Sequence, residues 1–182
     1  MDTLLTYPSL LVVVALSGAA ALSDLRTGLI PNELVLGGAV AAVLAQLLSV
    51  ALGHVTWGGA LSQLGLGFAA GTLLPLALHA GGALGGGDVK LFAAIGLCVG
   101  PQAALGIQFW SQLIAAGFLA LQLLVRGGLL QVLRTSGRMF LNLFRPRSRR
   151  KPIDRARLTS MRFAPAIFAA VLWVCTFTEY AP

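Results

Sequence analysis

The chain has 182 residues, of which 57% are hydrophobic and only 10% are charged, and its mean hydropathy is +0.86. These values are typical of a polytopic membrane protein and exclude an ordinary soluble domain. The net charge of +7 does not indicate nucleic-acid binding, because eleven of the thirteen lysines and arginines lie between residues 126 and 162 without a pattern of stacking aromatics. We predict an all-α fold in which residues 1–182 form a single membrane domain.

Six apolar segments predict a bundle of about six transmembrane helices. They are residues 4–22, 34–52, 60–80, 89–99, 103–125 and 163–180. The first has Asp2 before it and no lysine or arginine, unlike the basic start of a signal peptide, so we expect this segment to be retained. The fourth is only about 16 Å long as a helix, too short for a hydrocarbon core of roughly 30 Å. It either crosses a thinned or tilted region or begins below the membrane surface with Asp88 already inside.

The basic residues predict the orientation of these spans. With both termini outside, the inner segments are 23–33, 81–88 with the start of the next helix, and 126–162. They contain all thirteen lysines and arginines, and the outer segments contain none. Asp24 and Asp88 would then lie on the same, cytoplasmic, face.

The long inner loop has a pattern of its own. Residues 129–145 predict an amphipathic helix on the inner leaflet, because the polar side chains fall within about 100° of arc on a helical wheel. A polybasic tail follows at 145–157. We expect anionic lipid to be bound there, with docking of an acidic partner as the alternative. The basic residues concerned are Arg134, Arg138, Arg145, Arg147, Arg149, Arg150 and Lys151.

Asp24 is one of two carboxylates at the edge of an apolar segment, where a charge is costly to keep. It ends the first segment, and Gly28 with Pro31-Asn32 forms a short turn behind it. Taken alone, Asp24 is better explained by a structural pairing with Arg26 or with a lipid head group than by a catalytic role.

Asp88 follows a stretch in which five of the seven residues 81–87 are glycines. Such a stretch lets the backbone approach another segment or a substrate closely. The structural alternative is a flexible loop after which Asp88 serves as the N-cap of the next helix.

Considered together, the two carboxylates predict acid–base chemistry. Two carboxylates held close can share one proton. The ionised one, Asp24 or Asp88, would act as a base on water, and the protonated one would polarise a scissile carbonyl and protonate the leaving amine. This pattern indicates peptide hydrolysis without a covalent intermediate, a metal or a cofactor.

Other reactive side chains are given structural interpretations. His54 is placed on the outer face, and His79 is interpreted as a helix-end residue. Cys98 and Cys175 lie far apart in apolar segments and are interpreted as inert thiols. A further pair, Gly67 and Gly71, predicts a close contact between helices.

The two aspartate motifs resemble those of a known family. Asp24 followed by Ile30-Pro31-Asn32, together with Gly85-Gly86-Gly87-Asp88-Val89-Lys90, closely resembles the type IV prepilin peptidases, which are GxGD aspartic proteases of the bacterial inner membrane. The short length is similar to the branch serving tight-adherence (Flp-type) pili. The resemblance covers a peptidase core at about 8–120. Residues 163–167 resemble the family's last-helix signature, with Arg162 where a proline is expected.

This resemblance implies roles for the motif residues. Asp24 and Asp88 would be the catalytic pair, and the supporting residues would be Gly85, Gly86, Gly87, Lys90, Pro31 and Asn32. The implied reaction is removal of a basic leader from a pilin precursor at the cytoplasmic face, and the pilus assembly machinery is a further expected partner. Larger members carry paired CxxC motifs and also N-methylate the product. This chain has no CxxC, so we expect no methyltransferase activity.

Two other functions remain open at this stage. The first is a related GxGD protease with another substrate, such as an archaeal preflagellin or a signal-peptide remnant. The second is a non-catalytic membrane scaffold or small transporter that uses the aspartates as an ion or proton site.

Overall fold

The computed structural model describes residues 8–126 and 162–177, and every regular element in these ranges is a helix. The five helices are α2 (Pro8–Thr27), α3 (Asn32–Ala51), α4 (Trp57–Ala80), α5 (Gly86–Arg126) and α7 (Ala164–Phe177). The first four are long and apolar enough to cross a membrane. The all-α prediction is therefore confirmed, whereas the count of six spans is not reached by the described helices. The predicted amphipathic helix at 129–145 and its basic tail lie outside the described residues.

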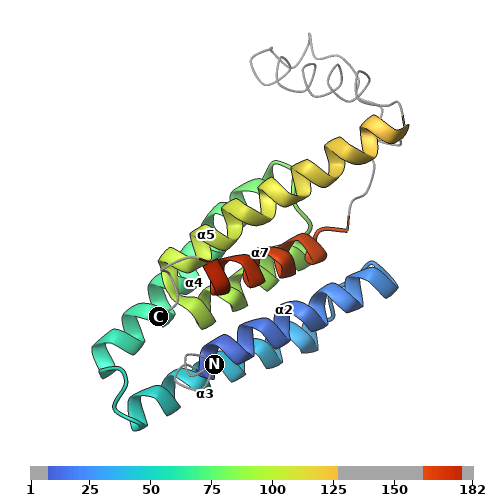
Figure 1. Ribbon diagram of the computed structural model, residues 1–182. Coiled ribbons are helices and arrows are strands. Elements are labelled where there is room, and N and C mark those ends of the chain that lie inside the picture. The colour runs from blue at the N-terminus through green and yellow to red at the C-terminus, as the bar shows by residue number, and fades with distance from the viewer. Residues whose placement is uncertain (1–7, 127–161, 178–182) are drawn as a thin grey trace. The chain divides into compact units, whose positions relative to one another are not determined.

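The chain consists of two compact units, residues Met1–Ile114 with Arg162–Pro182, and Ala115–Met161. In the first unit, α2 packs against both α3 and α7, and α3 contacts α4 (Figure 1). Its core is built mainly from small and branched side chains of α2, α5 and α7. Fully buried examples are Val13, Leu91, Ile95, Ile107, Ile167 and Val171. In the second unit, the described residues are the last part of α5.

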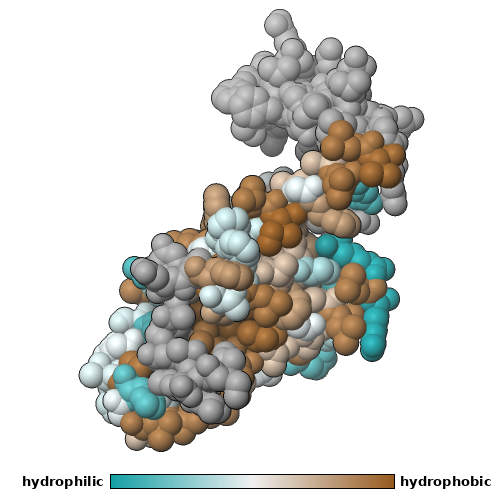
Figure 2. Space-filling model, viewed as in Figure 1, coloured by the Kyte–Doolittle hydropathy of each residue, from teal (hydrophilic) through white to brown (hydrophobic). Residues whose placement is uncertain are grey.

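The outward faces of the first unit are apolar. Exposed leucines are spread along α3 and α4, as at Leu36, Leu44, Leu61 and Leu73. In Figure 2 hydrophobic side chains cover the middle of the visible face, and hydrophilic ones lie towards its ends. In water such a surface would be costly, whereas lipid tails solvate it.

Helix α2 extends further than the hydropathy of residues 4–22 predicts. It continues through Asp24 to Thr27 and ends where Gly28 adopts a left-handed φ of 71°. The Gly28 N–H donates to the Asp24 carbonyl at 2.9 Å, which is the αL termination that glycine favours. Asp24 therefore lies inside the last turn of a helix, and its backbone is fixed.

Segments 89–99 and 103–125, expected as separate spans, both belong to α5. The helix is interrupted between them at Gly100, whose φ of 78° and ψ of 179° are not helical, and Pro101 follows directly. A left-handed φ of this kind is accessible to glycine without steric cost. The predicted break is thus present, and α5 consists of two helical segments that meet at Gly100.

The chain turns back on itself at this break. A Cβ placed on Gly71 would lie 2.4 Å from the Phe92 carbonyl oxygen, and the neighbouring Ala70 carbonyl accepts from Gln108 Nε2 at 2.9 Å. In a straight helix, positions 92 and 108 are about 24 Å apart. Because both reach adjacent residues of α4, the segments before and after Gly100 lie side by side within the first unit.

Helices α4 and α5 are in backbone contact through glycines. A Cβ on Gly67 would lie 2.1 Å from the Gly96 carbonyl oxygen, and a Cβ on Gly96 would lie equally close to the Gly67 oxygen. Real Cβ atoms essentially never come within 3.0 Å of such an atom. The close contact predicted from Gly67 and Gly71 is therefore confirmed, and α5 supplies the other half of it.

Candidate functional site

Asp24 is held at the point where α2 ends and α7 begins. Its side chain is only 7% exposed, and Oδ2 accepts a hydrogen bond from the backbone N–H of Ala164 at 3.2 Å. Ala164 is the first residue of α7. A helix N-terminus presents free N–H groups and a partial positive charge, so it stabilises a carboxylate placed there. The pairing with Arg26 considered from the sequence is not what anchors Asp24.

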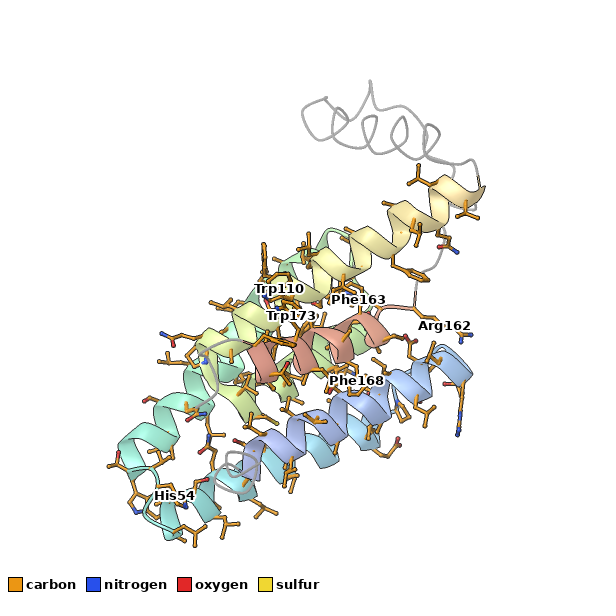
Figure 3. All side chains as sticks on the ribbon, in the orientation of Figure 1. His54, Trp110, Arg162, Phe163, Phe168 and Trp173 are labelled. Atoms are coloured by element: carbon orange, nitrogen blue, oxygen red, sulfur yellow. The ribbon has the colours of Figure 1, made fainter. Side chains whose placement is uncertain are left out.

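Two further contacts fix the entrance of α7 beside Asp24. The Arg162 guanidinium donates through Nη1 to the carbonyl oxygen of Leu25, the residue after Asp24. The Phe163 ring lies 6.2 Å from that of Phe92 on α5, centroid to centroid. Figure 3 shows Arg162 and Phe163 next to each other where the chain enters α7. Arg162, which departs from the family pattern, thus contributes a contact that a proline could not make.

Asp88 is the third residue of α5, and the N-cap position is occupied by Gly85. The interpretation of Asp88 as the N-cap is therefore wrong by three residues. Its half-buried carboxylate instead reaches back to the backbone of Gly85, as the third residue of a capping box does. A Cβ on Gly85 would lie 2.9 Å from Asp88 Oδ2. The absence of a side chain at Gly85 leaves room for the carboxylate.

The glycine-rich loop between α4 and α5 is held by hydrogen bonds. Gly82, with a φ of 75°, donates to the His79 carbonyl at 2.8 Å, and Ala83 donates to the Leu78 carbonyl at 2.9 Å. These two bonds make a Schellman motif, a regular helix ending. The His79 ring adds a third bond, because Nδ1 lies 2.8 Å from the Leu84 carbonyl oxygen. The loop is thus structured rather than flexible.

The two sequence motifs meet in space. Lys90 Nζ donates to Asn32 Oδ1 at 2.8 Å, which links the start of α5 to the start of α3. Gly87 faces Ile30, since a Cβ there would lie 3.6 Å from the nearest isoleucine side-chain carbon. Between these contacts, Pro31 occupies the N-cap position of α3 in an extended conformation.

Asp24 and Asp88 themselves are close enough for a repulsive interaction between their charges. One carboxylate comes from the end of α2 and the other from the start of α5, and they differ in exposure, buried against half-buried. Like charges in this arrangement disfavour ionisation of both carboxylates at once.

The two histidines are separated by the length of the bundle. His54 follows α3, a helix of 20 residues that starts at Asn32 beside the site, and is therefore about 30 Å away along that helix. Figure 3 shows His54 at the end opposite Arg162. His79, by contrast, lies in the last turn of α4, just before the loop that leads to Asp88 in the first turn of α5.

The fold and this site define a class of protein: a bundle of apolar helices, suited to a membrane, with a pair of carboxylates gathered at one end. A model of the type IV leader peptidase family matches residues 11–121, which is more than half of the chain and includes both aspartates. The chain belongs to this family of proteases, as its motifs predicted. No curated protein and no solved structure matches it.

Proposed function

We propose that the protein is an aspartic endopeptidase that removes the leader peptide from type IV prepilins of the Flp type. The observation that carries this proposal is the convergence of Asp24 and Asp88 at one end of the bundle. It is supported by the family match and by the backbone contacts of each carboxylate, with Ala164 of α7 for Asp24 and with Gly85 at the start of its own helix for Asp88.

In this reaction one carboxylate, ionised, accepts a proton from a water molecule, and the water oxygen bonds to the scissile carbonyl carbon. The other carboxylate, protonated, donates to the carbonyl oxygen. When the C–N bond breaks, the proton taken from water passes to the leaving amine, and a hydroxyl of the tetrahedral intermediate returns its proton to the second carboxylate. No covalent enzyme intermediate is formed, and both carboxylates return to their starting state after product release.

The proposal includes an orientation in the bacterial inner membrane. The proposed topology has six crossings, with α5 counted twice because it folds back at Gly100, and has both termini outside and the aspartates at the cytoplasmic face. Lys90 and Arg26 lie at the same end as the aspartates, consistent with the inward preference of basic residues.

Two finer features of the proposal depend on the sequence alone. The basic segment 126–162 would bind anionic lipid of the inner leaflet more readily than a basic leader, which it repels. Since Cys98 and Cys175 form no CxxC motif, we propose leader cleavage without N-methylation, followed by handover of the pilin to the assembly machinery.

The test is cleavage of tagged Flp-type prepilins in membranes, followed by gel shift. The wild-type chain is compared with Asp24→Asn and Asp88→Asn at equal expression, and Glu33→Gln serves as the matched control because Glu33 is an exposed acid on the first turn of α3. The expected result is leader removal by the wild type and by Glu33→Gln, and none by either aspartate variant.

Equal processing by all four chains would refute the carboxylate pair. No processing of any prepilin would refute the substrate assignment. Proton- or ion-coupled flux in liposomes that Asp24→Asn or Asp88→Asn abolishes would replace the protease with a transporter.

A further inference from the structure

We propose that His79 is a positioning residue, which holds the glycine-rich loop so that the Asp88 carboxylate is correctly placed. The expected effect of His79 on the rate of cleavage rests on the proposed function. The expected effect of His79 on the structure of the loop follows from the contacts of the loop alone.

The geometry of the loop singles out His79. Residues 81–83 are already fixed by the Schellman motif that ends α4. From Gly85 onward the chain is fixed by α5, whose first turn includes the bond from Val89 N–H to the Gly85 carbonyl at 3.3 Å. The junction between these two regions is Leu84, and its carbonyl oxygen takes a hydrogen bond from the His79 ring.

The ring also packs on the loop from outside. A Cβ on Gly86 would lie 3.6 Å from His79 Cε1 and 4.0 Å from Nε2. The imidazole therefore spans the turn, with one edge bonded to Leu84 and the other lying over the first residue of α5. Two residues further on is Asp88.

The hydrogen bond determines the state of the ring. A carbonyl oxygen only accepts, so Nδ1 must carry the proton of this hydrogen bond. Because Nδ1 is engaged with the backbone, this nitrogen cannot exchange protons with the substrate. The contacts thus indicate that His79 holds the backbone in place, which requires only an N–H donor at the δ position.

Loss of this donor would release Leu84 and, with it, the glycine-rich stretch behind Asp88. Glycines lose more conformational freedom on ordering than other residues, so this stretch depends on its hydrogen bonds. Displacement of a catalytic group by about 1 Å can cost on the order of a hundredfold in rate.

The experiment uses three variants of the full chain in detergent micelles or nanodiscs. His79→Ala removes the donor, and His79→Asn restores an N–H at the δ position without an ionisable ring. His54→Ala is the matched control, because His54 lies at the opposite end of the bundle. Each is measured by prepilin cleavage, by the temperature of unfolding and by hydrogen–deuterium exchange of peptides covering 81–92.

For His79→Ala we expect a ten- to hundredfold lower kcat with KM unchanged, an unchanged unfolding temperature, and faster exchange in 81–92. His79→Asn should recover most of both kcat and protection, and His54→Ala should match the wild type.

Three results would overturn the proposal. The first is unchanged hydrogen–deuterium exchange in residues 81–92 of His79→Ala. This result overturns the proposal whether or not the wild type cleaves prepilin, so the exchange measurement is independent of the proposed function. Recovery of protection but not of activity in His79→Asn would make the imidazole a catalytic group. A lower unfolding temperature with kcat unchanged would make its role purely structural.

Discussion

The contact between α4 and α5 leads to a quantitative prediction about Gly96. In Gly96→Ala, the new Cβ would lie 2.1 Å from the Gly67 carbonyl oxygen and 3.2 Å from the Gly71 Cα. To move from 2.1 Å to the 3.4 Å of ordinary contact, the helices must separate by about 1.3 Å. The obstructing atoms belong to the backbone, so no side-chain rotation relieves the clash.

The free-energy change has two opposed parts. Overpacking of a fitted interface costs about 1–3 kcal/mol, and a clash with backbone belongs at the upper end. Replacing glycine by alanine within a helix contributes about 1 kcal/mol in the favourable direction. Gly96→Ala should therefore destabilise the fold by about 2 kcal/mol.

Gly65→Ala is the matched control on α4. Nothing lies within 4 Å of a Cβ at Gly65, so only the propensity gain applies, and this variant should be stabilised by up to about 1 kcal/mol. The assay is unfolding in mixed micelles, followed by tryptophan fluorescence, since Trp110 and Trp173 lie 5.4 Å apart between ring centroids. If Gly96→Ala is as stable as Gly65→Ala, the close helix contact does not exist.

Three further substitutions test how the site is held. Gly85→Ala should lower cleavage by at least about tenfold, with little change in unfolding temperature, because its Cβ displaces the Asp88 carboxylate; full activity would show that the carboxylate has room to spare. Lys90→Met and Asn32→Ala should each reduce cleavage severalfold, and a double-mutant cycle in unfolding should give a coupling energy of no more than about 1 kcal/mol, since the bond is exposed; strictly additive effects would argue against the bond. Arg162→Ala should lower kcat and leave KM nearly unchanged, because the start of α7 loses its hydrogen bond to the Leu25 carbonyl. An unchanged kcat would show that the Ala164 N–H stays in place without Arg162.

Much of the fold could be predicted from hydropathy, because apolar length is a direct requirement of a membrane-spanning helix. The predicted segments 34–52 and 60–80 agree with α3 and α4 to within three residues. The apolar run stops at residue 22 and the sequence predicts that Asp24 ends the helix, whereas α2 continues to Thr27. Its last turn is polar, and the turn residue that ends it is Gly28.

For the candidate site, the sequence predicts which side chains take part but not the backbone groups that hold them. The motifs around Asp24 and Asp88 indicate which two carboxylates to consider. They also indicate a family, and the family match agrees with it. The donor that holds Asp24 is the backbone N–H of Ala164, and a backbone group has no residue-type signal. The sequence predicts His79 only as a satisfied helix-end residue. Its bond to Leu84 could not be predicted, because it depends on a Schellman turn that glycine content alone does not specify.

The bond between Asp24 and Ala164 also has a consequence for the order of biosynthesis. It joins residues 140 positions apart, and ribosomes add about 5–20 residues per second. The first carboxylate therefore emerges from the ribosome roughly 7–28 seconds before its helix-end donor does. A nascent chain that has inserted α2 to α5 already contains both aspartates but has yet to complete their surroundings. The surroundings of Asp24 are thus completed only after α7, the last of the described helices, has been made.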